Sequence, residues 1–287
     1  LSLALALPMF NCFAGNGDVL VAACKKGDLA GVQKALAEGA DVNAKNSEGW
    51  NPISASFFWP EITQLLLDKG ADVGALNNAA LGSAARTASY KTMEILLKAG
   101  ADPNKTNTGS APLQYIVSYT SCKECLELLI SKGAKTDVIN SNTNGNLLDD
   151  LASSYLFGKE KADNEKPQVG GWEKMGFAVP DWYRNQDTTL YASPNEMVKV
   201  LVKAGVNINA ENKLKNTPLL TSLSRPNQTR PALVLAFISN GANVNVEGYA
   251  YKGPALLQAA GHGYVNVLEA MFAKGADMNM EFKVNDP

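Results

Sequence analysis

The chain has 287 residues, of which 46% are hydrophobic and 19% are charged, and its formal net charge is −2. Duplex nucleic acid is bound mainly through neutralised phosphates, so a chain with 26 basic and 28 acidic residues is not expected to bind it. No run reaches the roughly 18 consecutive apolar residues that a membrane-spanning helix needs. We therefore expect no integral membrane segment in the mature chain.

Residues 1–17 contain an apolar run that is followed by small residues. The run stops at Pro8, and Cys12 and Ala14 come after it. This order is typical of the end of a secretory signal peptide with cleavage after Ala14, and it predicts a periplasmic or secreted protein. Two alternatives stay open. One is an apolar half-helix that caps the fold of a cytoplasmic protein, and the other is a lipid anchor on Cys12.

From residue 18 onward the chain predicts pairs of helices. Apolar positions at helical spacing, such as those around 65–67 and 95–97, lead into a glycine, where a helix ends easily in a left-handed turn. A second helix rich in small residues precedes each of them, as at 79–85. Ser193, followed by a proline and by Glu196, predicts a capped helix start.

A glycine-centred string recurs along the chain. It begins at Gly39, Gly70, Gly100, Gly133, Gly205, Gly241 and Gly275. All spacings but one lie near 33 residues, and the exception marks a fifth unit with a long insertion. One such unit cannot bury its apolar face alone, so the pattern predicts units that stack on their neighbours.

This pattern resembles the ankyrin repeat. Residues 216–219, Asn-Thr-Pro-Leu, are similar to the start of the family's first helix, and residues 259–264 are similar to the turn between its two helices. The resemblance covers about residues 18–287 and implies an all-α ankyrin-repeat solenoid of about seven helix-turn-helix units. It also implies a scaffold that binds another protein and that needs neither catalysis nor a cofactor.

Cys122 and Cys125 are three residues apart at a predicted helix start. Ser121 and Glu124 form a capping pattern that places Cys122 at the first helical position, where backbone N–H groups favour a thiolate. Disulfide oxidoreductases use the same spacing, but after a strand of a sheet. We therefore prefer a structural pair, possible as a disulfide in an oxidising compartment, and keep a thiol-redox module as the alternative. Cys24 is expected in the core.

The other titratable residues do not predict a catalytic or metal site. Asp149 and Asp150 are adjacent on a predicted helix, so their side chains point in different directions, and we expect one of them to meet solvent. His262 is the only histidine of the chain and is expected in a surface turn. One histidine cannot supply a multi-histidine metal site.

Residues 158–193 form the insertion between the two helices of the fifth unit. Long loops in compact folds are usually functional or disordered, and this one has an aromatic composition that argues against disorder. Its aromatic residues are Trp172, Phe177, Trp182, Tyr183 and Tyr191. They either pack back onto the solenoid or contact a partner, since Trp and Tyr dominate binding hot spots. An enzyme site beneath the insertion is a third possibility.

The turns between the units offer a second candidate surface. Trp50, Tyr249 and Tyr251 are large aromatic residues at predicted turn tips, where they have no obvious packing role. We predict that they contact a protein partner, together with Trp172, Trp182 and Tyr183 of the insertion. Asn46 and Asn212 lie in the same turns and are expected to hydrogen-bond to local backbone.

Overall fold

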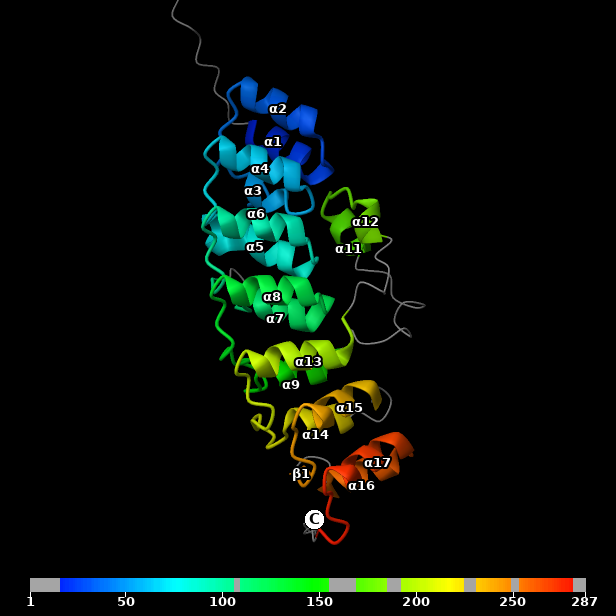
Figure 1. The fold of residues 1–287 in the computed structure, drawn as a ribbon. Coiled ribbons are helices and arrows are strands. Elements are labelled where there is room, and N and C mark those ends of the chain that lie inside the picture. Colours follow the sequence, from blue (N-terminus) through cyan, green and yellow to red (C-terminus); the bar gives the residue numbers. More distant parts are fainter. Residues whose placement is uncertain are drawn as a thin grey trace, which may run out of the picture.

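The computed structural model describes residues 16–105, 109–154, 169–184, 192–224, 231–248 and 253–280. In this part of the chain, fourteen helices form seven pairs that stack in chain order into an elongated solenoid (Figure 1). We number the pairs as repeats 1 to 7. The expected all-α stack of about seven helix-turn-helix units is confirmed. None of the described helices is long and apolar enough to span a bilayer.

Each repeat contributes two antiparallel helices. Repeats 1 to 4 contain α1 (Asn16–Lys26) and α2 (Leu29–Ala37), α3 (Pro52–Ala55) and α4 (Pro60–Asp68), α5 (Ala75–Arg86) and α6 (Tyr90–Lys98), and α7 (Pro112–Tyr115) and α8 (Lys123–Ser131), with a π-helical turn η1 (Ile116–Thr120) after α7. Repeats 5 to 7 contain α9 (Leu147–Ser153) and α13 (Pro194–Lys203), α14 (Pro218–Leu223) and α15 (Pro231–Ser239), and α16 (Ala255–Gly261) and α17 (Val265–Ala273).

Local sequence signals explain most helix boundaries. Ser193 caps α13 through its hydroxyl, which accepts from the Glu196 N–H, and the Glu196 carboxylate accepts from the Ser193 N–H in return. Pro60 and Pro231 open the second helices of repeats 2 and 6. The glycine after each second helix takes a left-handed conformation, as Gly100 does with φ at 95°.

Asparagine side chains join the turns of neighbouring repeats. In four repeats, the asparagine four residues after the turn glycine donates from Nδ2 to the glycine carbonyl of the next repeat. Its Oδ1 accepts from the N–H two residues beyond that glycine, at 2.7–2.8 Å. We call these paired contacts rungs, and they are formed by Asn43, Asn104, Asn209 and Asn245. Repeat 2 has Gly74 at this position instead.

A short antiparallel pair of strands, β1 (Glu247–Gly248) and β2 (Gly253–Pro254), flanks the turn between repeats 6 and 7. Two further helices, α11 (Val169–Lys174) and α12 (Asp181–Arg184), belong to the insertion. They lie beside the N-terminal repeats rather than beside repeat 5, from which the insertion leaves (Figure 1). We call residues 169–184 the docked segment.

Candidate protein-binding surface

The docked segment is held by a cluster of aromatic rings on repeat 2. Phe57 and Phe58, between α3 and α4, are fully buried beneath it. The Trp172 ring lies 4.9 Å from the Phe57 ring, and the Tyr183 ring lies 5.1 Å from the Phe58 ring, centroid to centroid. Phe177 also contacts Phe57 at 5.1 Å. These separations are typical of favourable aromatic pairs, so the segment is bound by ring packing.

A glycine turn brings the two main anchors of the docked segment together. Gly176 has φ at 81°, a conformation that side-chain-bearing residues rarely adopt. The turn closes with the Gly176 N–H bonded to the Glu173 carbonyl and the Phe177 N–H bonded to the Trp172 carbonyl. As a result the Trp172 and Phe177 rings meet edge to face at 5.5 Å and face repeats 1 and 2 together.

Lys25, at the end of α1, binds the main chain of the docked segment. Its Nζ donates to the Met175 carbonyl at 3.0 Å, and its own carbonyl accepts from the Ala178 N–H at 2.9 Å. The same ammonium forms an ion pair with Glu48 and lies 5.3 Å from the centre of the Phe177 ring. A buried charge is thus balanced by a carboxylate, a carbonyl and a ring face.

Arg86, at the end of α5, completes the surface. Its guanidinium lies 5.6 Å from the centre of the Trp172 ring and 5.4 Å from that of Tyr119, on η1. Arginine over the face of an aromatic ring is attracted by the ring quadrupole. Arg86 therefore links the docked segment to repeats 3 and 4.

The predicted partner-contact residues have different environments. Trp172 and Tyr183 are buried in the aromatic cluster, so their packing role accounts for them, whereas the Trp182 side chain is 44% exposed. The expectation that Trp50 has no packing role was wrong: its ring is half-buried and lies edge-on to Phe177 at 5.3 Å. Tyr249 and Tyr251 lie outside the described residues, as does Tyr191.

Sequence reasoning missed the receiving side of this surface. Phe57, Phe58, Lys25, Arg86 and Tyr119 were not singled out. The signal for the two phenylalanines was present, because residues 56–59 read Ser-Phe-Phe-Trp in a turn between helices, where polar residues are usual. No sequence pattern marks Lys25, since its partners lie in a segment far along the chain.

Comparisons with known proteins agree on the family. The family model for ankyrin repeats in three copies matches residues 20–107 and 61–142. The chain is an ankyrin-repeat protein. It is 32% identical over 114 residues to the ankyrin repeat protein nuc-2 of Neurospora crassa, a match that covers 37% of this chain and 11% of the relative. The human ASB11 ankyrin repeat domain has the same fold, with a TM-score of 0.62 and 17% identity over 90% of this chain and 98% of that domain.

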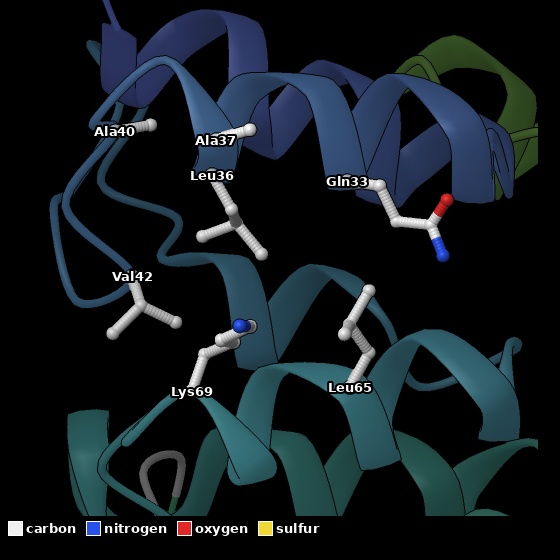
Figure 2. A pocket seen from close by; sticks show the side chains of 7 residues that line it. All are labelled: Gln33, Leu36, Ala37, Ala40, Val42, Leu65 and Lys69. Atoms are coloured by element: carbon white, nitrogen blue, oxygen red, sulfur yellow. The ribbon is translucent and has the colours of Figure 1, made fainter.

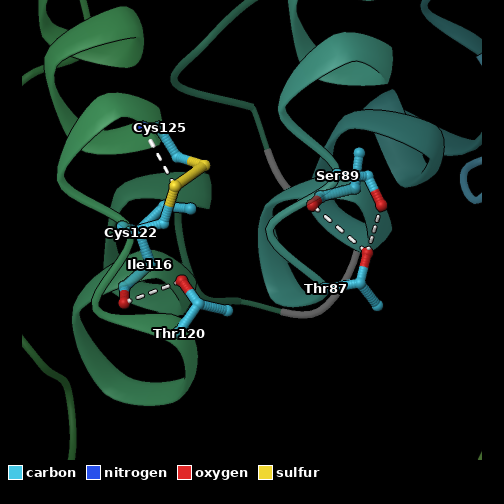
Figure 3. The surroundings of a disulfide bond; sticks show 7 residues. Thr87, Ser89, Ile116, Thr120, Cys122 and Cys125 are labelled. Atoms are coloured by element: carbon cyan, nitrogen blue, oxygen red, sulfur yellow. Dashed lines mark hydrogen bonds between the residues drawn. A yellow bond between two sulfur atoms is a disulfide. The ribbon is translucent and has the colours of Figure 1, made fainter. Parts of the chain in front are cut away.

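The cysteine pair lies at the start of the second helix of ankyrin repeat 4. Cys122 and Cys125 are joined as a disulfide (Figure 3). Cys122 is the N-cap of α8, with its Sγ accepting from the Cys125 N–H, and not the first helical residue as the sequence predicted. The shift by one residue arises because Ser121 takes a left-handed conformation, with φ at 49°, which ends η1.

The adjacent aspartates of α9 are both buried, which corrects the expectation that one of them meets solvent. Asp149 accepts from Thr221 Oγ1 at 2.6 Å and from Asn212 Nδ2 at 3.0 Å. Asp150 accepts from Asn140 Nδ2 at 2.7 Å and from Gln114 Nε2 at 3.2 Å. Burial raises the pKa of Asp150. The two carboxylates therefore bind repeats 4 and 6 to repeat 5.

The turn asparagines behave as predicted. Asn46 accepts from the N–H groups of Glu48 and Trp50, and Asn212 accepts from those of Leu214 and Asn216. Each side chain thus fixes the backbone of its own turn.

Two other features bear on the alternative of an enzyme. A groove between α2 and α4 is lined by apolar side chains together with the Gln33 amide and the Lys69 amine (Figure 2). Its described lining residues include no nucleophile beside a base and no pair of carboxylates. His262 lies at the end of α16, where its Nε2 is 2.8 Å from the Leu223 carbonyl of repeat 6, so it joins two repeats. In the described part of the chain, no three His, Cys, Asp or Glu residues gather as metal ligands would.

Proposed function

We propose that this ankyrin-repeat protein is a non-catalytic scaffold that binds a protein partner at the surface formed by repeats 1 to 3 and the docked segment. Ankyrin repeats are generally protein–protein interaction modules. One observation carries the proposal. This end of the solenoid binds a polypeptide segment from elsewhere in the chain, through ring packing and main-chain hydrogen bonds of the kind that partners make.

Exposed aromatic residues border this surface. Trp182 on α12 packs its ring 6.0 Å from Phe58, yet much of the ring meets solvent. Tyr119 on η1 is 46% exposed and is held beneath the Arg86 guanidinium. Trp, Tyr and Arg held in place by neighbours are the residues that most often dominate binding energy. Tyr249 and Tyr251, which lie outside the described residues, stay proposed contacts that are separate from this surface.

We also propose that the protein works in the periplasm or outside the cell. The apolar start of the chain supports this location, although the segment lies outside the described residues. A disulfide between Cys122 and Cys125 fits the same compartment, because disulfides persist in oxidising environments. The partner would then be another envelope or extracellular protein.

Site-specific photo-cross-linking tests the function. A photoreactive phenylalanine analogue replaces Trp182 in one variant and Phe272 in another, and each is irradiated in an envelope extract. Phe272 is the matched control because it is an aromatic residue of similar exposure on α17, at the opposite end of the solenoid (Figure 1). We expect a discrete cross-linked species from position 182 alone. Equal products at both positions, or none at either, would contradict the proposal.

A further inference from the structure

We infer that the surface beneath the docked segment is a binding site for an aromatic segment of a partner protein, and that residues 169–184 occupy it when the partner is absent. The inference rests on the proposed function and names the kind of partner, which contacts exposed Trp182 before its own aromatic segment displaces residues 169–184. Its starting point is that the site is seen with an occupant, so the chemistry of that occupant shows what the site accepts.

The receiving surface is built mostly from groups that a foreign segment can also use. Lys25 hydrogen-bonds to main-chain atoms of its occupant, namely the Met175 carbonyl and the Ala178 N–H, and its ammonium also lies over the Phe177 ring. Any peptide of suitable shape presents these main-chain atoms. Phe57 and Phe58 supply ring faces for two aromatic side chains, and Arg86 supplies a cation for one of them. The site thus requires aromatic side chains at particular positions of the bound segment and accepts many different residues between them.

The present occupant has little structure of its own. Its helices α11 and α12 have six and four residues, far below the length at which an isolated helix persists in water. Within the segment the Glu173–Arg184 ion pair is exposed and contributes little. The docked conformation therefore depends on contacts with repeats 1 to 3, and undocking leaves the helix pairs of the solenoid in place.

The aromatic residues of the docked segment that contact the repeats indicate the sequence that a partner segment needs. It carries a tryptophan, then a glycine that permits the left-handed turn of Gly176, then a phenylalanine directly after that glycine. A tyrosine follows at the place of Tyr183, which packs on Phe58. The acidic and basic side chains of the occupant are equal in number, two of each, so no strong net charge is required.

The docked segment belongs to the same chain as the repeats, and this explains why it keeps the site occupied. A tethered segment acts at an effective concentration of about 1 mM, so a free peptide with micromolar intrinsic affinity competes poorly with it. Weakening the internal anchors removes the competitor and leaves the receiving surface unchanged. The prediction is a large gain in affinity for an external segment.

The test uses a synthetic peptide of residues 169–184 as the probe and calorimetry as the measurement. The open variant carries Trp172→Ala and Phe177→Ala, both of which lie in the occupant and not in the repeats. We expect the peptide to bind the open variant about 100-fold more tightly than the intact protein. A control peptide with the same two alanines is expected not to bind. Circular dichroism confirms that the open variant keeps its helices.

A receiving-side variant checks the location. Adding Arg86→Gln to the open variant removes the cation above the Trp172 position, and we expect about fivefold weaker peptide binding. Failure of the peptide to bind the folded open variant, or equal binding to both proteins, would overturn the inference. So would an intact protein that dimerises through its own segments, since the occupant would then be a second copy.

The two proposals fail separately. Cross-linking at position 182 without peptide binding to the open variant would leave the scaffold function in place and remove the inference. Peptide binding to the open variant without any cross-linked partner would support the site and remove the proposed function in the extract tested.

Discussion

At the scale of single residues, the buried carboxylates of α9 show how this solenoid uses polar groups inside its core. Asp149 and Asp150 accept hydrogen bonds from amide and hydroxyl donors on repeats 4, 5 and 6. Donors of this kind satisfy the oxygen atoms but only partly offset the cost of burying a charge. Burial therefore favours the protonated form of Asp150 more in the folded state than in the unfolded state, which raises its pKa.

This shift predicts a pH dependence of stability. A raised pKa means that the folded state holds the proton more tightly than the unfolded state, whose Asp pKa is about 3.9. The contribution of Asp150 to the free energy of unfolding is thus greatest below about pH 4 and falls as the pH rises through the raised folded value. We expect Asp150→Asn to lose this fall, so that the free energy of unfolding in urea changes less between pH 4 and pH 7 than it does in the wild type. Because its single amide oxygen can accept from only one of the Asn140 and Gln114 donors, its stability at each pH is expected to be lower than removal of the charge alone would give.

Two variants make that result specific. Asp150→Ala leaves the Asn140 and Gln114 donors unpaired, so we expect it to cost about 1–3 kcal/mol at pH 7. Glu127→Gln removes an exposed carboxylate on α8 and serves as the control. A pH profile of Asp150→Asn that matches the wild type would contradict the assigned role of burial.

The cysteines give a second prediction at this scale. Burial raises the pKa of the Cys24 thiol to about 12, so almost no thiolate is present at neutral pH. In a Cys12→Ser background, we expect no rapid alkylation of the native oxidised protein, as measured by mass spectrometry. After mild reduction, half-buried Cys122 is expected to react before buried Cys125. Rapid modification of Cys24 would contradict this picture, and a lowered Cys122 pKa would favour the thiol-redox alternative.

Residue environments were the least predictable level. The apolar neighbours of Cys24 correctly indicated that it is buried, and the turn preference of asparagine correctly indicated the roles of Asn46 and Asn212. The expectations for the Asp149–Asp150 pair and for Trp50 failed, because their surroundings come from other parts of the chain. Gln114 of repeat 4 meets Asp150, and Phe177 of the insertion meets Trp50. Such contacts depend on tertiary packing that no local pattern encodes.

At the scale of elements, the asparagine rungs set how one repeat follows the next. Each rung satisfies two backbone groups of a turn that would otherwise rely on water. We expect Asn104→Ala to lose both bonds to repeat 4 and to lower the free energy of unfolding by about 1–2 kcal/mol in urea. An alanine at exposed Lys105, which forms no rung, is the matched control.

The missing rung of repeat 2 gives the converse prediction. Gly74 has φ at −85°, which any residue adopts, and an added Cβ would meet only an ordinary contact with Asp72. Gly74→Asn supplies the side chain that can reach the Gly100 carbonyl, as Asn43 reaches that of Gly70. We expect a gain of about 1 kcal/mol from the new bonds and the smaller entropy of the unfolded chain. Gly74→Ala separates the two causes, and equal gains from both would argue against a new rung.

Elements were more predictable than residues. The period of the glycines gave the number of helix pairs, and the capping residues gave the start of α13 within one residue. The start of α8 was misplaced because a left-handed Ser121 mimics a cap in sequence. The place of α11 and α12 could not be predicted, since the aromatic composition of the insertion fits either packing on the solenoid or contact with a partner and does not indicate which repeats receive it.

At the scale of the whole molecule, the docked segment connects repeat 5 with repeats 1 to 3. Trp172→Ala removes its largest buried ring, a change that costs about 3 kcal/mol or more when the side chain is fully packed. We expect faster amide hydrogen exchange in α1 and α3 by roughly tenfold or more, with α17 unchanged. Trp182→Ala, which removes a half-exposed ring, is expected to have a much smaller effect. Unchanged exchange in α1 and α3 would show that docking does not stabilise them.

The insertion also changes the topology of cooperativity. In a simple repeat array, the free energy of unfolding is a sum of the stabilities of the repeats and of the interfaces between neighbouring repeats. Each end of the array therefore unfolds independently of the other. Here the docked segment, which belongs to the insertion of repeat 5, packs on repeats 1 to 3 and closes a long non-covalent loop. Unfolding of the N-terminal end must therefore break a contact between residues that are more than one hundred positions apart in sequence. Closing this loop costs conformational entropy, because many residues separate its two ends. We therefore expect the contact to form late in folding. We thus expect repeats 1 to 5 to unfold as one cooperative unit and repeats 6 and 7 to unfold independently of it.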